Sequence, residues 1–443
     1  MTVATGAAGE PTDPRPPRSV LEQVRALPSS LEVDTRLLGM VAALAVIWIG
    51  FHIASNGNFI TPRNLWNLSV QSTSIAIMAT GMVLIIVSRN IDLSVGAMLG
   101  FIGYTMAMVQ VEWIPKALGL GFGQPYTWLV AIGVGLALGA FIGGLQGFIV
   151  AYGRVPAFIV TLGGLLVWRG LIFRYGQGQS LGPMDATYQL LGGNGPRASM
   201  GDIFSWLLGA LICLGIAWTI ISNRRRRRRY GFPVRPRWAE FAVGIASSVA
   251  VLAFIWVANS YPWPSSLATQ YAVDRGITEP PGGLILATGV AFPVVIMLGV
   301  GLVMTYVATR RPFGRYVFAI GGNPDAAELG GINVRRTIML TFALMGMLAA
   351  VSAAIQTARL NLAVTNLGIQ NELDVISAAV IGGTSFAGGI GTIPGAILGA
   401  VVMQSLRSGM ALTLVDSPTQ DIVVGVVLVA AVGLDAFLRR RST

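Results

Sequence analysis

The sequence has very little of the chemistry that most enzymes and metal proteins use. It contains one cysteine, Cys213, so it can form no internal disulfide and no cluster of thiol ligands. Its one histidine, His52, argues against a histidine metal site and against a Ser-His-Asp triad. The only lysine, Lys116, follows a proline rather than a glycine-rich loop, so the chain has no Walker A nucleotide site. We therefore predict a protein that is not an enzyme and that binds no metal or cofactor itself.

Charged residues are also scarce. They make up 11% of the chain, against about 25% in an average soluble domain, whereas 54% of the residues are hydrophobic. The net charge of +11 comes almost entirely from arginine. It fits the excess of positive charge on the cytoplasmic side of membrane proteins better than a nucleic-acid footprint. The composition predicts an all-α, polytopic membrane helical bundle with no nucleic-acid partner.

Apolar segments long enough to span a bilayer recur along residues 37–438, and they predict about twelve transmembrane helices. The segment 371–389 contains Glu372 and Asp374 and is also compatible with a partial helix. The predicted spans are 37–54, 65–88, 93–111, 126–152, 155–175, 203–222, 239–259, 284–308, 337–356, 371–389, 391–411 and 419–438.

The arginine run Arg224–Arg229 sets the predicted orientation, because such a cluster stays on the cytoplasmic side. An even number of crossings then places both termini in the cytoplasm. Residues 1–36 are polar and proline-rich, so they are expected to be a flexible N-terminal tail, and 439–443 a short C-terminal tail. The external loops 176–202 and 260–283 are either a docking surface for an external partner or plain surface.

Glycine recurs at every fourth position in two segments. The first set is Gly135, Gly139, Gly143 and Gly147, and the second is Gly391, Gly395 and Gly399. This spacing lines one face of a helix with small residues, which lets two helices approach closely in lipid. It predicts helix packing and says little about function.

A short helix with both ends specified lies in the cytoplasmic loop 309–336. Asn323 is a good N-cap, and Pro324 suits the first helical position. Gly330 and Gly331 provide the stop, because glycine tolerates the left-handed conformation after a helix. Alanines 326 and 327 leave one face nearly flat, as expected of a helix that presses into a groove on another protein.

Three motifs resemble those of one family of membrane proteins. Asp325-Ala326-Ala327, with Gly331 four positions further on, resembles the coupling loop of bacterial ABC importer permeases, with Asp in place of the usual Glu. The stretches 313–323, 81–96 and 381–392 resemble signatures of the monosaccharide branch, most strongly of the xylose type. The resemblance covers roughly residues 60–411 and most of the last predicted helix. The insertion 203–259, two helices around an arginine-rich loop, resembles a feature of the xylose-type subfamily.

The resemblance implies a permease subunit in the bacterial plasma membrane that takes up D-xylose or a related pentose or hexose. The implied partners are a cytoplasmic ATP-binding subunit that uses ATP and Mg²⁺, an extracytoplasmic sugar-binding protein, membrane lipids and a second copy of the chain. The residues that the resemblance assigns to coupling with the ATPase are Asn323, Asp325, Ala326, Ala327, Glu328, Gly331 and Arg335.

Polar residues near the second and tenth predicted spans are candidates for the translocation path, because sugar hydroxyls need amide and carboxylate partners. An equal alternative places them in an external gate or loop without sugar contact, and for the stretch 88–96 a capped tight turn. Family members usually carry glycines where Arg89 and Asn90 stand, which leaves the role of these two open. The candidates are Gln71, Asn90, Asp92, Ser94, Asn361, Asn366, Glu372 and Asp374.

Two other classes of protein compete with this interpretation. An ion-coupled secondary sugar transporter would need buried acidic residues as relays within the membrane, and most of the predicted spans have none. A membrane enzyme would need a nucleophile beside a base, and the sequence offers no such constellation.

Overall fold

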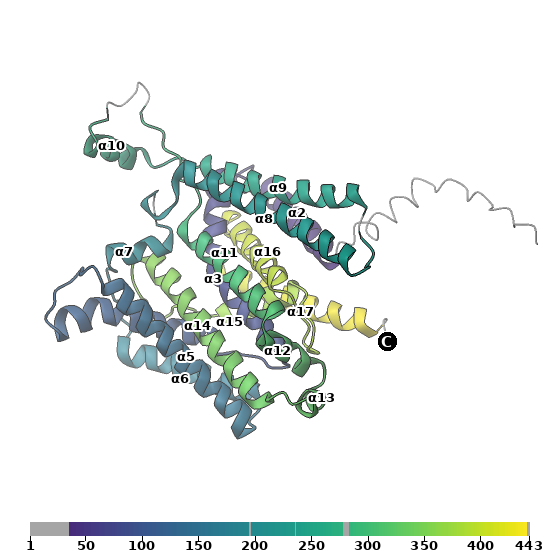
Figure 1. Cartoon of the computed structure of the whole chain (residues 1–443). Helices are drawn as coiled ribbons and strands as arrows, with labels where there is room; N and C mark the ends of the chain where they lie inside the picture. Colours follow the sequence, from purple (N-terminus) through teal and green to yellow (C-terminus); the bar gives the residue numbers. More distant parts are fainter. Residues whose placement is uncertain (1–34, 195, 235, 278–282, 441–443) are drawn as a thin grey trace, which may run out of the picture.

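The computed structural model describes residues 35–440 except 195, 235 and 278–282. The tails expected at 1–36 and 439–443 lie largely outside the described residues. The described part of the chain is helical, and its extended backbone pairs only as isolated bridges between loops. The predicted all-α helical bundle is confirmed (Figure 1).

Ten helices in the described part of the chain are long and apolar enough to cross a membrane. They are α2 (Thr35–Ala54), α3 (Pro62–Val87), α4 (Val95–Met108) with its π-helical continuation η1 (Val109–Ala117), α5 (Thr127–Gly153), α6 (Ala157–Gly176), α8 (Gly201–Arg229), α9 (Arg237–Asn259), α11 (Phe292–Arg310), α14 (Val334–Leu360) and α16 (Ile393–Leu412). The other α-helices are α7 (Ala186–Gln189), α10 (Ser265–Asp274), α12 (Pro312–Gly322), α13 (Pro324–Leu329), α15 (Asn371–Ile381) and α17 (Ser417–Arg440).

Two of the predicted crossings account for the difference between twelve and ten. In the segment 371–389 only α15 is helical, and its 11 residues are too few to span a bilayer. The helix stops at a run of glycines, of which Gly383, Gly388 and Gly389 have left-handed backbone angles. The last segment forms α17, a helix of 24 residues whose apolar part Ser417–Gly433 ends where its side chains are no longer described.

Helix α3 forms the centre of the bundle and contacts α9, α11, α12, α14, α15 and α16. Almost every residue from Ser72 to its C-terminus is buried, although several carry hydroxyl groups. Most of these hydroxyls donate to backbone carbonyls one turn earlier, as from Thr73 to Val70 at 2.6 Å and from Thr80 to Ile77 at 2.7 Å, whereas Ser74 accepts from the amide of Gln356 on α14 at 2.9 Å. The polar groups are therefore satisfied within the bundle, and the small side chains of α3 allow neighbours to pack closely.

The glycine face of α5 packs against α14, as its spacing predicted. A Cβ atom added at Gly139 would strike the carbonyl oxygen of Gly346, and one at Gly143 would strike that of Phe342. In the second set, Gly399 meets the backbone of α15 at Ala378 in the same way. Both glycine sets therefore bring backbones together, which larger side chains would prevent.

The loops gather at two opposite ends of the bundle. One end holds the segments predicted to be external, joined by bridges between Leu181 and Ala363 and between Pro262 and Ala287. The other end holds α12, α13 and the turns that follow α3 and α15. The loops therefore sort as the predicted topology requires, and which end faces the cytoplasm stays a prediction.

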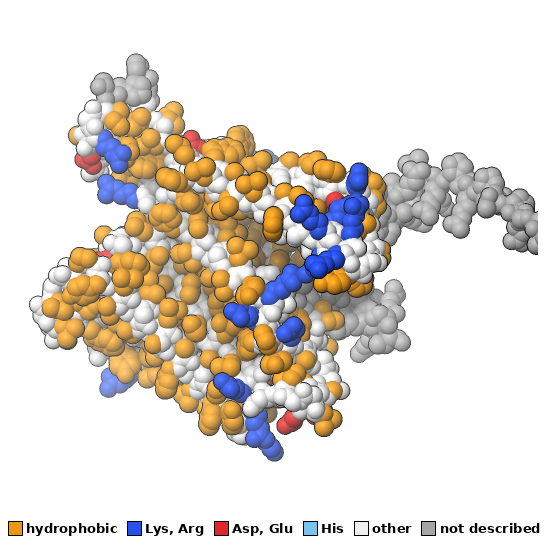
Figure 2. Space-filling model, viewed as in Figure 1, with side chains coloured by type: hydrophobic (Ala, Val, Ile, Leu, Met, Phe, Trp, Pro, Cys, Tyr) orange, Lys and Arg blue, Asp and Glu red, His pale blue; other side chains and the backbone are white. Residues whose placement is uncertain are grey.

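Helices α8 and α9, the predicted insertion, form a hairpin at the edge of the bundle (Figure 1). Only 11% of each span is buried inside the chain, so most of their surface is open to lipid. Figure 2 shows hydrophobic side chains over much of the visible face and several Lys and Arg side chains near the end where α8 stops and α13 lies.

The packing of α5 on α14 yields a stability prediction. Gly139→Leu should lower the thermal unfolding midpoint of the purified protein, because overpacking costs about 1–3 kcal/mol or more when the obstacle is backbone. Gly133→Leu is the matched control, since nothing lies within 4 Å of a Cβ atom at Gly133 on the same helix. Equal midpoints for the two variants would contradict the close contact.

Candidate functional site

Three of the motifs found in the sequence meet at one point of the structure. The backbone N–H of Gly389, in the glycine-rich hairpin, donates to the carbonyl of Val87 at the end of α3 at 3.0 Å. The guanidinium of Arg89 donates from Nε to the carbonyl of Gly321 at 2.8 Å and from Nη2 to that of Gly322 at 2.7 Å. We call this meeting of the ends of α3, α12 and the hairpin the junction.

Arg89 performs two tasks at the junction. Its backbone is left-handed, with φ of +62°, which explains why glycine suits this position in the family that the sequence resembles. Its side chain binds the last carbonyls of α12, which have no partner inside that helix and lie at the negative end of its dipole. Arg89 therefore fastens α12, and α13 behind it, to the central helix.

Helix α13 forms with the ends that the sequence specified. The side chain of Asn323 accepts a hydrogen bond from the N–H of Ala326 at 3.0 Å, and Pro324 is the first helical residue. The helix is six residues long and ends at Leu329. Gly331 then turns the chain with φ of +81°. The next residues lead into α14, on whose first turn Arg335 is exposed.

The surface of α13 differs in one respect from the expected flat alanine face. Asp325, Ala326 and Glu328 are exposed, but Ala327 is 6% exposed and faces the chain itself. The most exposed apolar side chain on this helix is Leu329, at 90%. Leu329 is not among the predicted coupling residues, although a leucine beside the glycine stop is the signal that could have found it.

A polar pocket of 540 Å³ lies between α3, α14, α15, α16 and α17, toward the end predicted to be external. Of the predicted path residues, Gln71 and Asp374 line it. The other polar residues that line it are Ser74, Gln356, Arg359, Gln370, Asn371, Gln404, Arg407, Ser417 and Asp421.

An arginine links three helices in this pocket. Arg407 of α16 binds Asp374 of α15 through Nε at 3.0 Å and Nη2 at 2.9 Å, and its Nη1 lies 3.5 Å from Asp421 of α17. Nearby, the amide of Gln404 donates to that of Gln71 on α3 at 3.0 Å. Sequence reasoning missed Gln404, Arg407 and Asp421, which stand as isolated polar residues within apolar segments.

The other path candidates lie outside the pocket. Asn90 donates to Ser88 within its own turn at 2.9 Å. Asn361 ends α14 in a left-handed conformation, and its side chain accepts from the N–H of Met184 at 2.9 Å. Asn366 is exposed in the loop before α15. Asn90 and Asn361 therefore bind loop backbone in this structure.

Asp92 and Ser94 are buried at the break between α3 and α4. One oxygen of Asp92 accepts from the N–H of Ser94 at 2.9 Å and from its hydroxyl at 2.6 Å, which closes a tight turn, but neither side chain caps α4. The Ser94 hydroxyl also lies 3.0 Å from Gln146 of α5. Glu372 packs beside Gly96 of α4, and no described residue makes a hydrogen bond to its buried Oε2.

Comparison with known proteins identifies the family of this chain. The family model described as the permease component of branched-chain amino acid transport systems matches residues 64–432. The chain belongs to this permease family. The permease is 37% identical to the xylose transport system permease protein XylH of Escherichia coli (strain K12), over 93% of this chain and 94% of the relative. No solved structure matches it.

Two further relatives agree with this result. The XylH protein of Haemophilus influenzae is 34% identical over 92% of the permease and 98% of its own length. The ribose import permease protein RbsC of Escherichia coli (strain K12) is 32% identical over 89% of the permease and 92% of its own length. The predicted class, a non-catalytic permease subunit in a bacterial plasma membrane, is confirmed by this family and by the ten apolar helices.

The two hydrogen bonds of Arg89 yield a prediction. Arg89→Ala should speed hydrogen–deuterium exchange in α12 and α13 by at least roughly tenfold, since a hydrogen bond to a charged group contributes about 1.5–3 kcal/mol. Arg154→Ala is the matched control, because Arg154 ends α5 in the same left-handed conformation with an exposed side chain. Exchange that is equally slow in both variants would mean that Arg89 does not hold α12.

Proposed function

We propose that the permease is the membrane subunit of an ATP-driven importer of a monosaccharide, and that its substrate is D-xylose or a related pentose or hexose. The observation that carries this proposal is the near full-length similarity to permeases named for xylose and ribose transport. As a permease component it works with a separate ATP-binding subunit, which uses ATP and Mg²⁺, and with a sugar-binding protein outside the membrane. The permease itself binds no cofactor.

The polar pocket has the chemistry that a sugar path requires. Amide groups from Gln71, Gln356 and Gln404 can exchange hydrogen bonds with hydroxyls, and Asp374 can accept them. Apolar side chains such as Ile75 and Ile355 line the same space and suit the CH faces of a sugar ring. The pocket is open rather than closed around these groups, which favours passage of a sugar over tight retention.

The position of the pocket supports a homodimer. Its lining includes Gln71, which is exposed, and the charged Arg359 and Arg407, which are partly so. Polar and charged groups facing lipid are costly. We therefore infer that a second copy of the permease covers this face and that two facing pockets form one central pathway.

An ion-coupled mechanism is the alternative, and Asp374 is the buried carboxylate that lines the polar pocket. A relay carboxylate must exchange protons or cations during transport. Asp374 is instead held by two hydrogen bonds from Arg407. Its charge is therefore satisfied within the permease, which favours a structural role over ion coupling.

Uptake into vesicles tests the proposed function. Proteoliposomes that contain the permease and its ATP-binding subunit should accumulate labelled xylose when ATP is inside and the sugar-binding protein is outside. Omission of ATP or of the binding protein should abolish uptake, because the permease has no energy source of its own. Uptake driven by an imposed proton or sodium gradient without ATP would establish the ion-coupled alternative instead.

We propose that α13 is the element that transmits ATPase closure to the membrane helices. It presents the exposed Asp325, Ala326 and Glu328 at the surface, and Asn323, Gly331 and Arg335 set its ends and the exit of the chain. Leu329 supplies the apolar contact. The buried Ala327 packs α13 against the rest of the permease. A displacement of α13 by the ATP-binding subunit then reaches α3 through the hydrogen bonds of Arg89 at the junction.

A substitution at Leu329 tests this coupling contact. Leu329→Arg should weaken co-purification of the ATP-binding subunit by roughly tenfold or more, since burial of a leucine is worth about 1.5–3 kcal/mol. Leu414→Arg is the control, because Leu414 is 91% exposed at the opposite end of the bundle. Ala327→Arg is less informative, since it would disturb packing inside the permease. Wild-type binding by Leu329→Arg would show that α13 is not docked through this residue.

A further inference from the structure

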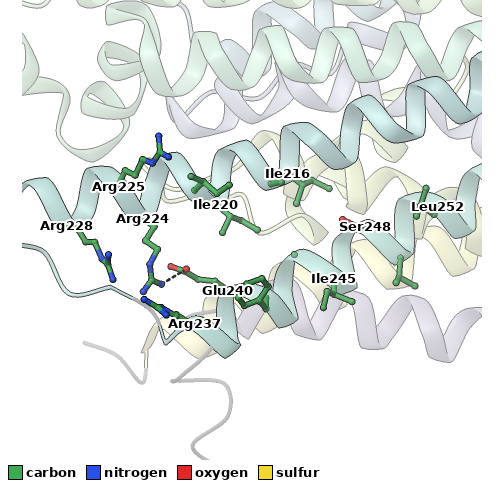
Figure 3. A pocket seen from close by; sticks show the side chains of 15 residues that line it. Ile216, Ile220, Arg224, Arg225, Arg228, Arg237, Glu240, Ile245, Ser248 and Leu252 are labelled. Atoms are coloured by element: carbon green, nitrogen blue, oxygen red, sulfur yellow. Dashed lines mark hydrogen bonds and ion pairs between the residues drawn. The ribbon is translucent and has the colours of Figure 1, made fainter.

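A groove of 720 Å³ opens between α8 and α9, away from the pocket and the junction described above. Figure 3 shows its two parts: isoleucine and leucine side chains along the length of the helices, and arginines at one end. Ile216, Ile220 and Ile245 belong to the apolar part. Both helices are spans of the peripheral hairpin, so the apolar part of the groove lies at membrane depth.

The arginine end of the groove carries a net positive charge. Arg224 and Glu240 form an ion pair across the two helices and cancel each other's charge. Arg225, Arg228 and Arg237 line the same end, and all three are exposed. No acidic residue other than Glu240 lines this groove among the described residues. The mouth therefore attracts an anion.

The groove is also shaped by the contact between its walls. A Cβ atom added at Gly244 of α9 would lie 3.1 Å from Ile220 of α8, so the two helices touch at that level. The ion pair of Arg224 with Glu240 joins them near the arginine end. The walls are thus held together beside an open apolar channel, rather than separated by a loose gap.

We propose that this groove binds an anionic phospholipid, with an acyl chain along the apolar walls and the phosphate among Arg225, Arg228 and Arg237. A soluble phosphate would need the arginines but not the apolar channel. A zwitterionic lipid would fill the channel but gain little from three positive charges. Basic pockets between transmembrane helices on the cytoplasmic side are known to favour anionic headgroups. The occupant keeps the hairpin fixed in the membrane beside the bundle.

Native mass spectrometry of the permease from nanodiscs that contain equal phosphatidylglycerol and phosphatidylcholine tests the headgroup contact. Arg225→Gln with Arg228→Gln should weaken phosphatidylglycerol retention about 25-fold, because each basic group near an anionic lipid contributes about fivefold. The matched control is Arg226→Gln with Arg229→Gln, which removes the same charge from α8 at positions that do not line the groove. The control should retain the lipid as the wild type does.

A second pair of variants tests the acyl contact without any change in charge. Ala217→Trp fills the groove from α8 and should also reduce phosphatidylglycerol retention, whereas Ala246→Trp, on the exposed face of α9 outside the groove, should not. Glycerol 3-phosphate at millimolar concentration should not displace the lipid. Equal losses in the lining and control variants, equal retention of phosphatidylcholine, or displacement by glycerol 3-phosphate would each overturn the proposal.

Discussion

Lipid offers no hydrogen bonds to a peptide group, and this constraint decides where the chain of the permease can leave the helical conformation. The chain breaks within the bundle after Val87 and again after Ile381, and the two irregular segments lie side by side. The N–H of Gly389 satisfies the carbonyl of Val87 directly. Each break is therefore covered by the other, and both are tolerated because the surrounding helices exclude lipid.

The same constraint explains why the functional motifs are found together. A break in a membrane helix needs partners from elsewhere in the chain, so it becomes a point where distant segments are joined. At the junction, Arg89 supplies such a partner to the last carbonyls of α12. Under the proposed coupling role, a movement of α13 would reach the central helix α3 through these contacts of Arg89 with α12.

The peripheral hairpin of α8 and α9 is attached to the bundle by far fewer buried residues than the central helices are. It adds little to the buried core, and its surface is open to lipid over most of its length. Its arginines stand at one end, where an ion pair between Arg224 and Glu240 joins the two helices. Because so little of the hairpin is buried, an additional contact would stabilise its position. A bound anionic lipid would provide such a contact at the membrane surface.

The sequence by itself determined the class of the permease, ten of the twelve predicted spans and the ends of α13. Hydrophobic runs, caps and glycine spacing are local signals, and each depends on residues within a few turns of one another. Sequence also placed Gln71 and Asp374 in what became the polar pocket. It could not separate them from Asn361, which holds a loop in place, or from Asn366, which is exposed in a loop outside the pocket.

Only the tertiary structure decided which side chains face one another. Arg407 and Asp374 lie 33 positions apart, and Arg89 meets carbonyls more than 230 positions away, so no local pattern reveals either contact. The burial of Ala327 and the exposure of Leu329 likewise depend on how α13 packs on its neighbours. Local propensity fixes the helices, whereas long-range packing fixes their rotation, and the rotation of a helix determines which of its residues can act.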